Sequence, residues 1–223
     1  MIIVSVGGSV INPGEPDKKF LRELSRVFIR VHSKNPLAIV TGGGKPARAY
    51  AGAIRELGGS QFLADKAAIL ATRQNASLLI AALGKNAWPA VPKTFEEAAL
   101  SASTGKIVVM GGTIPGITTD TDAALLAELL GAGRIVNISN VDGIYTADPR
   151  KDSSARKISK MKFQELSGLA SKGDSRKPGE NFVFDSFACK IIARSGIEAH
   201  FIGTSDIEAA LLGKKHSGTV VCD

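Results

Sequence analysis

LAIVTGGGKPAR, residues 37–48, is the stretch that decides the fold of this chain. Four apolar residues run into a threonine and three glycines, and basic residues follow. A run of this length is typical of a buried strand, and the glycines at its end predict a turn into a helix. We therefore predict a strand over 37–40 and a helix over 48–57, which ends at Gly58-Gly59.

The same succession occurs at two other places. The apolar residues 2–6 run into Gly7-Gly8-Ser9, and residues 106–110 run into Gly111-Gly112. Apolar spacing predicts further helices over 18–31, 65–83 (with Asp65 as N-cap), 120–130, 163–170, 185–195 and 205–212, and strands over 87–91, 134–139, 198–202 and 218–222. Short apolar strands that alternate with helices favour the α/β fold class, with a mostly parallel central sheet covered on both faces.

Composition limits the class of protein. With 44% hydrophobic and 22% charged residues in 223 positions, the chain is predicted to be globular, and no break in composition divides it. Cys189 and Cys222 share no short spacing with a histidine, which argues against a zinc site or a disulfide framework and favours a reducing cytoplasm. The apolar N-terminal run stops at Gly7, too early for a signal peptide, and the longest apolar run, 77–83, is shorter than the roughly 20 residues of a membrane span.

The formal net charge of +7 indicates an anionic partner. Aromatic residues make up only 5% of the chain and do not alternate with the basic ones, so small polyphosphates are favoured over nucleic acid. Ligands of open α/β sheets bind at the carboxyl ends of the strands, where all three glycine clusters are expected. One glycine pair is more simply a tight turn, but three at equivalent junctions favour a phosphate site, because glycine lets backbone N–H groups approach a phosphate.

Two known phosphate motifs can be compared with the second cluster. The P-loop pattern is absent, because Gly44-Lys45 is followed by Pro46. The dinucleotide pattern is a competitor, since Gly42-x-Gly44-x-x-Ala47 fits it and Asp65 lies about twenty residues further on. Asp65, however, begins a predicted helix rather than ending a strand, and that motif leaves the other glycine loops unexplained.

The chemistry that these loops favour is phosphoryl transfer. The three histidines are scattered and no nucleophile motif occurs, whereas phosphoryl transfer needs mainly positioning and cations. Lys45 and Arg48 follow the second glycine loop, on one face if a helix begins there. They are either solvated charges or phosphate ligands, and cations at a helix N-terminus are unfavourable unless an anion joins them.

Two polar segments complete the pattern. Residues 113–119 are rich in threonine and offer hydroxyl and backbone groups to a small polar ligand, although an N-cap accounts for one threonine or for Asp120. Residues 147–181 are rich in lysine and arginine and are predicted to be a loop region with one short helix. This region is either a lid over the site or a solvated surface excursion.

Taken together, the motifs resemble the amino-acid-kinase family, and within it the UMP kinases of the archaeal type. The segments that carry the resemblance are Val6–Val10 (VGGSV), Gly42–Arg48 (GGGKPAR), Met110–Asp120 (MGGTIPGITTD), Asn140–Pro149 (NVDGIYTADP) and Lys190–Ile197 (KIIARSGI). They extend over essentially the whole chain. The family's fold is a three-layer αβα sandwich in a single domain, 1–223, with an acceptor-binding part over roughly 1–130 and an ATP-binding part over roughly 131–223.

The resemblance implies transfer of the γ-phosphoryl group of ATP to UMP, which gives UDP and ADP in pyrimidine nucleotide biosynthesis. It also implies Mg²⁺ carried with ATP, no protein metal site, a cytoplasmic homohexamer, and no nucleic-acid or membrane partner. The residues implied for ATP are Gly8, Ser9, Gly44, Arg48, Ser139, Asn140, Tyr145 and Asp148. Those implied for UMP are Gly43, Asp65 (on the ribose hydroxyls), Thr113, Ile114, Pro115, Gly116, Ile117, Thr118 and Thr119.

The chain departs from the family before the first glycine pair, where many relatives carry a lysine and this chain has Ser5-Val6. We hypothesise that Lys45 with Arg48 takes the catalytic role of that lysine, with Lys160 and Lys162 in reserve. A different acceptor, such as isopentenyl phosphate or carbamate, is an alternative, but isopentenyl phosphate kinases show a histidine where this chain has Thr41. A non-catalytic nucleotide sensor is a second alternative.

Overall fold

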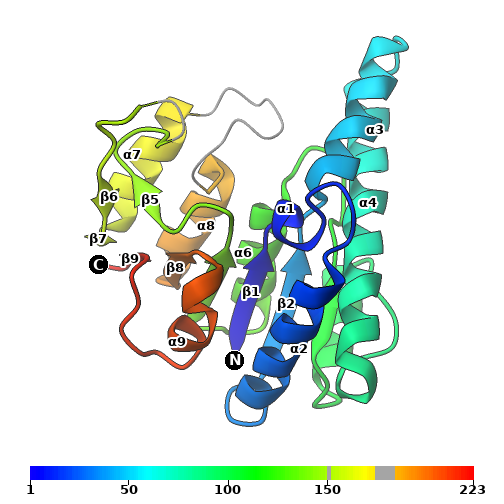
Figure 1. Ribbon diagram of the computed structural model, residues 1–223, viewed down its shortest axis with the longest axis horizontal. Helices are drawn as coiled ribbons and strands as arrows, with labels where there is room; N and C mark the ends of the chain where they lie inside the picture. The colour runs from blue at the N-terminus through cyan, green and yellow to red at the C-terminus, as the bar shows by residue number, and fades with distance from the viewer. Residues whose placement is uncertain (150–151, 174–183) are drawn as a thin grey trace.

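The computed structural model describes residues 1–149, 152–173 and 184–223. Its strands are β1 (Ile2–Val6), β2 (Leu37–Thr41), β3 (Val108–Met110), β4 (Arg134–Ile138), β5 (Ile144–Tyr145), β6 (Lys157–Ile158), β7 (Lys160–Met161), β8 (Glu198–Ile202) and β9 (Thr219–Val221). Its α-helices are α1 (Gly8–Ile11), α2 (Lys18–His32), α3 (Gly44–Glu56), α4 (Gln61–Leu83), α5 (Phe95–Ala102), α6 (Thr119–Leu129), α7 (Phe163–Gly173), α8 (Ser186–Ser195) and α9 (Ile207–Leu211). Figure 1 shows their arrangement.

A seven-stranded sheet forms the middle layer, in the order β3-β2-β1-β4-β8-β9-β7. Neighbouring strands from β3 to β8 are parallel, β9 runs antiparallel to β8, and β7 runs parallel to β9. The carboxyl ends of β1, β2, β3, β4 and β8 therefore share one edge of the sheet, the edge where ligands of open α/β sheets bind. A separate antiparallel pair joins β5 to β6.

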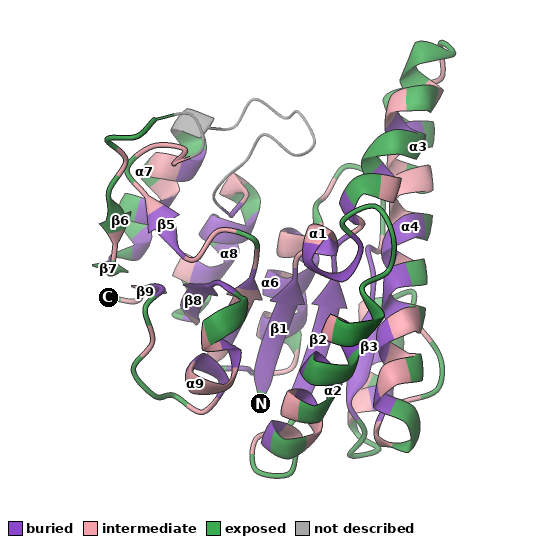
Figure 2. Cartoon of the chain, viewed as in Figure 1, coloured by how far each residue is buried: buried purple, intermediate pink, exposed green. Residues whose placement is uncertain are grey.

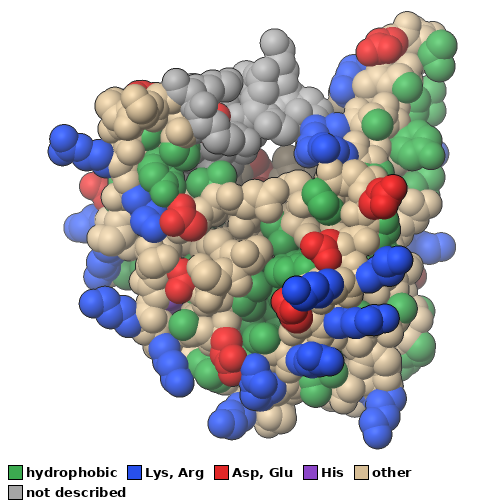
Figure 3. All heavy atoms as spheres, viewed as in Figure 1, with side chains coloured by type: hydrophobic (Ala, Val, Ile, Leu, Met, Phe, Trp, Pro, Cys, Tyr) green, Lys and Arg blue, Asp and Glu red, His purple; other side chains and the backbone are tan. Residues whose placement is uncertain are grey.

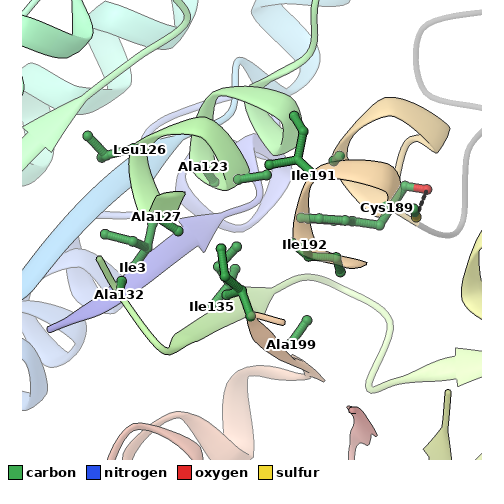
Figure 4. Close-up of a cluster of buried hydrophobic side chains, with 14 of the residues drawn as sticks. Ile3, Ala123, Leu126, Ala127, Ala132, Ile135, Cys189, Ile191, Ile192 and Ala199 are labelled. Atoms are coloured by element: carbon green, nitrogen blue, oxygen red, sulfur yellow. Dashed lines mark hydrogen bonds between the residues drawn. The ribbon is translucent and has the colours of Figure 1, made fainter. Parts of the chain in front are cut away.

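Helices cover both faces of the sheet, so the predicted three-layer fold is confirmed. Alternate residues of β1 point to opposite faces, with Ile3 in one apolar cluster and Val4 in the other. One cluster unites the sheet with α5, α6, α7 and α8, and the other unites it with α2, α4 and α9. Figure 2 shows β1 and β2 buried along their length, and Figure 4 shows the first cluster around Ile135.

Several predicted boundaries were wrong. The helix predicted over 48–57 begins at Gly44, directly after β2. The helix predicted over 65–83 begins at Gln61, and its N-cap is the Ser60 side chain, which accepts from the Leu63 N–H at 3.3 Å, and not Asp65. The strand predicted over 87–91 is only an isolated parallel bridge between Ala87 and Ile107.

The region predicted as a polar loop over 147–181 is more structured than expected. It contains β6, β7 and α7, and α7 includes the short helix predicted over 163–170. Phe163 and Leu166 of α7 are buried in the first cluster, which fixes this helix against α8. The parts of the proposed lid at 150–151 and 174–181 lie outside the described residues.

α3 and α4 form a long hairpin that projects past the carboxyl ends of the strands (Figure 1). Residues 61–86 are long and apolar enough to cross a bilayer by length and composition alone, although no single apolar run is that long. Core helices of globular proteins pass the same test, and Ala76, Leu79 and Leu83 of α4 pack into the second cluster.

A histidine pair joins buried His200 of β8 to half-buried His216 in the segment before β9. His200 Nδ1 lies 2.7 Å from His216 Nε2, and His200 Nε2 lies 2.7 Å from Glu198 Oε1. The Gly218 N–H donates to His216 Nδ1 at 3.1 Å. His216 therefore carries its proton on Nε2 and donates to His200, which donates to Glu198, so that both rings are neutral.

We expect this pair to weaken the fold in mild acid. Burial lowers the pKa of both His200 and His216, and the nearby Arg134 cation lowers it further. The carboxylates of Glu198 and Asp206 offset only part of this effect. A depressed folded-state pKa gives stability that is present above the ordinary value near 6.5 and is lost as the pH falls through the folded value. The stability advantage of the wild type over His216→Asn should therefore shrink between pH 7.5 and pH 5, as measured by thermal unfolding. An advantage independent of pH would contradict it.

Candidate active site

The first two glycine loops touch each other at the sheet edge. A Cβ added to Gly8 would lie 2.0 Å from the Gly44 N, and one added to Gly42 would lie 2.7 Å from the Gly8 N. Gly44 has φ +67°, and a Cβ there would lie 2.6 Å from the Gly8 O. Such contacts leave room only for glycine, so packing alone requires these residues. The result is a backbone-lined floor between β1 and β2.

Lys45 lies in the first turn of α3, which begins on that floor, and Arg48 follows at the start of the second turn. Both are exposed, and no acidic residue lies in this turn. The Lys45 side chain reaches back over the loop after α1, where a Cβ on Gly14 would lie 3.8 Å from its Nζ. Two cations at the positive end of a helix raise its electrostatic energy, and an anion bound between them would remove this unfavourable energy.

The third glycine loop is held by α4 and α6. Thr72 Oγ1 accepts from the Gly112 N–H at 2.7 Å, and Arg73 donates to the carbonyls of Gly112 and Thr113 at 3.1 and 3.2 Å. Asp122 accepts from the Thr113 N–H and from its hydroxyl. The polar groups of Thr113 thus bind the protein itself, so this residue shapes the loop, and a ligand contact through its hydroxyl would have to displace Asp122.

Asp65 reaches the centre of the same loop. Its Oδ2 accepts from the Gly116 N–H at 3.0 Å, and its Oδ1 accepts from Gln61 Nε2 at 2.6 Å. Gly116 has φ +92°, a conformation that suits glycine. The structure therefore brings together Asp65 and the 113–119 loop, although they are about 50 residues apart in sequence. Ile114, Gly116 and Thr118 of this loop are exposed.

The carboxylates of Asp120, Asp122 and Asp185 converge beside this loop, and none of them was predicted as a site residue. Asp185 accepts from the hydroxyl of Thr118 and, at 3.0 Å, from that of Thr121, and it also caps α8. Burial and the nearby Asp185 carboxylate raise the pKa of Asp120 to about 7. Burial raises the pKa of Asp122 to about 6, against the hydrogen bonds from Thr113.

Asp120 is held from the sheet by two residues of the central strands. Ser5 Oγ of β1 donates to Asp120 Oδ1 at 3.2 Å, and Asn137 Nδ2 of β4 donates to the same atom at 3.1 Å. Ser5 and Asn137 are register partners on adjacent strands. The polar residues Ser5 and Asn137 within two mostly apolar strands were a signal that could have found this site, because buried polar side chains need partners.

The predicted nucleotide loop follows β4. Ser139 Oγ accepts from the Val141 N–H at 3.0 Å, which closes the turn, and Asn140 is exposed. Asp142 accepts from Tyr145 Oη and from Lys157 Nζ, both at 2.7 Å, and the Lys157 cation holds the pKa of Asp142 below its usual value. Asp142 also packs on the end of β8, since a Cβ on Gly203 would lie 3.0 Å from its Cβ.

The reserve lysines are not brought to this edge. Lys160 lies on β7, at the far edge of the sheet from β2, and Lys162 follows the carboxyl end of β7. β7 runs antiparallel to β8. The carboxyl end of β7 therefore lies at the amino ends of the central strands, away from the glycine loops. The hypothesis that Lys160 and Lys162 replace the missing lysine is therefore disfavoured by topology.

Comparison with known proteins agrees with this geometry. The family model described as "Amino acid kinase family" matches residues 1–203. This chain belongs to the amino acid kinase family. It is 44% identical to a uridylate kinase of Pyrococcus abyssi over 222 residues, which cover 99% of this chain and 98% of that protein, and 42% identical to that of Archaeoglobus fulgidus.

Solved structures support the same placement. The crystal structure of uridylate kinase from Archaeoglobus fulgidus matches with a TM-score of 0.89 and 41% identity, covering 99% of both chains. The UMP kinase of Bacillus anthracis shares the fold with a TM-score of 0.81 at 22% identity. The predicted family membership is thus confirmed, and the dinucleotide interpretation of the second glycine loop is wrong. In this amino acid kinase the loop begins α3 after the second strand, and Asp65 ends no strand.

Proposed function

We propose that this amino acid kinase transfers the γ-phosphoryl group of ATP to UMP, giving UDP and ADP in pyrimidine nucleotide biosynthesis. The contact between Asp65 and the Gly116 N–H is the observation that carries the assignment, because it puts a carboxylate beside a threonine-rich loop at a phosphate-binding edge. A carboxylate there can accept hydrogen bonds from ribose hydroxyls. Full-length similarity to uridylate kinases supports the choice of UMP.

The two substrates divide the chain. Residues up to about 130 supply the acceptor site, with Gly43, Asp65 and the 113–119 loop, and residues from about 131 supply the part of the ATP site that holds adenosine. Ser139, Asn140, Tyr145 and Asp148 hold the adenosine end of ATP, and Gly8, Ser9, Gly44 and Arg48 meet its phosphates. The close packing of Gly8 on Gly44 supports a shared phosphate floor between the two sites.

The residues suit in-line transfer to a phosphate. The acceptor oxygen of UMP is already ionised, so no general base is needed and positioning and charge neutralisation suffice. Lys45 and Arg48 supply charge at the α3 N-terminus. Mg²⁺ bound with ATP would supply charge neutralisation at its phosphates, and the carboxylate oxygens of Asp120 and Asp185 at this edge are of the type that would fit the ion.

Two observations separate this function from the alternatives. Thr41, where isopentenyl phosphate kinases show histidine, is fully buried and donates to the Thr72 and Met110 carbonyls, so this position holds β2 to its neighbours and presents no side chain to an acceptor. Figure 3 shows acidic side chains among the Lys and Arg side chains of the visible face, which is unfavourable for a polyanion on that face.

We further propose a cytoplasmic homohexamer. Large apolar side chains are exposed along the α3–α4 hairpin, where Leu57 is 87%, Leu70 60% and Phe62 59% exposed. Several large exposed apolar side chains on one hairpin are typical of protein interfaces. Size-exclusion chromatography with light scattering tests the assembly.

The function is tested by ADP release from Mg-ATP with a panel of acceptors. UMP should be the best acceptor by a wide margin over CMP, dUMP, carbamate and isopentenyl phosphate. Turnover of any acceptor excludes the non-catalytic sensor, and a better acceptor than UMP would refute the assignment.

Asp65→Ala is expected to raise the KM for UMP by about 10- to 100-fold, because a hydrogen bond to a charged group contributes about 1.5–3 kcal/mol. The KM for ATP should stay within about twofold of wild type. Glu56→Ala, which removes an exposed carboxylate from α3, is the control and should leave both KM values unchanged. Equal changes in both KM values for Asp65→Ala would argue against a ribose contact.

A further inference from the structure

Thr219 joins the small sheet to the large one through a single hydroxyl. Its side chain is fully buried on β9. Oγ1 accepts from the Ile144 N–H of β5 at 2.8 Å and donates to the Ile158 carbonyl of β6. Ile144 and Ile158 are cross-strand partners in the antiparallel pair. One oxygen thus holds both strands of the β5–β6 pair against β9 of the seven-stranded sheet.

The β5–β6 pair carries the segment assigned to adenosine. Tyr145 and Lys157, the second pair of register partners, both donate to Asp142, so the loop after β4 is closed on this pair. A Cβ on Gly143 would lie 3.0 Å from Thr219 Oγ1, so the backbone of the loop rests directly on the hydroxyl. Any shift of Thr219 would move the loop and Tyr145 together.

The chemistry needs a hydroxyl at this position. A hydroxyl can accept from an N–H and donate to a carbonyl at once, and neither valine nor alanine can do so. Valine matches threonine in shape but would leave the buried Ile144 N–H without this acceptor, which is costly. Serine keeps the oxygen and loses only a methyl group.

We propose that Thr219 is a positioning residue for ATP, which sets the place of the adenosine-binding loop without touching the nucleotide. This proposal rests on the proposed function, because it takes Tyr145 and its neighbours as the ATP side of the site. It assigns a role in substrate affinity to a residue near the C-terminus, more than 70 residues beyond the loop that it holds.

The test compares Thr219→Val with Thr219→Ser. Thr219→Val should raise the KM for ATP about tenfold, with the KM for UMP within about twofold of wild type, and Thr219→Ser should restore the KM for ATP. Amide hydrogen exchange should show faster exchange at Ile144 in Thr219→Val only. Ser25→Ala, which removes a buried hydroxyl from α2, is the control for a general loss of stability.

Each outcome decides the proposal. An unchanged KM for ATP in a folded Thr219→Val would overturn it, as would equal rises for ATP and UMP. Calorimetric titration with Mg-ATP separates this proposal from the proposed function. If the wild type binds Mg-ATP but does not phosphorylate UMP, the proposed function fails, while weaker Mg-ATP binding by Thr219→Val would still support the positioning role.

Discussion

Replacing Lys45 with methionine is expected to lower kcat for UMP phosphorylation by about 100-fold, which corresponds to about 2.7 kcal/mol of transition-state stabilisation. Methionine keeps the apolar stem and removes only the charge. β1 has Ser5-Val6 before the first glycine pair, and the Ser5 hydroxyl donates to Asp120, so β1 offers no cation to the transferring group. Lys45 is the cation on the neighbouring glycine loop, at the N-terminus of α3.

The measurement is single-turnover kinetics at saturating ATP and UMP, which isolates the chemical step. Lys34→Met, an exposed lysine that follows α2 shortly before β2 begins, is the matched control and should leave kcat unchanged. A rate for Lys45→Met within about tenfold of wild type would remove Lys45 from the catalytic role. Arg48→Met, one helical turn further on, then becomes the informative variant.

The sequence predicted the sheet well because most residues of each central strand are apolar and buried. Residues 2–6, 37–40 and 198–202 are strands, and glycines mark the ends of the first two. The errors lie where local signals compete with packing. α3 begins earlier than predicted because its first turn starts on the glycine floor. Residues 87–91 form only an isolated bridge, because Ala87 alone pairs with Ile107.

The site was predicted in part, for a related reason. Glycine loops and the Asp65–loop pairing follow from motif spacing and resemblance. The Asp120 network does not, because its members come from β1, α6, β4 and the N-cap of α8, and only the sheet register brings them together. Ser5 and Asn137 look like minor polar interruptions of strands until their shared acceptor is known.

Asp120 makes the folded state sensitive to pH. Its pKa of about 7 lies above the ordinary value of 3.8, through burial and the neighbouring carboxylates. The folded protein therefore holds this proton more tightly than the unfolded chain does. The resulting cost is absent below about pH 4, grows as the pH rises to 7 and is complete above that. A shift of this size corresponds to at most about 4 kcal/mol of folding free energy.

Asp120→Asn should therefore stabilise the protein at pH 8, raising Tm by about 5 °C or more, with little difference from wild type near pH 4. Both hydrogen bonds at this residue go to Oδ1, which the amide keeps, and the uncharged Nδ2 takes the place of the second oxygen beside Asp185. Glu56→Gln removes an exposed carboxylate from α3 and controls for the change in net charge. A gain in Tm that is the same at pH 5 and pH 8 would show that Asp120 does not titrate in this range. Stabilisation confined to neutral and alkaline pH would show that the ionised Asp120 carboxylate destabilises the native fold. A destabilising group at this edge is expected when the group is retained for its function.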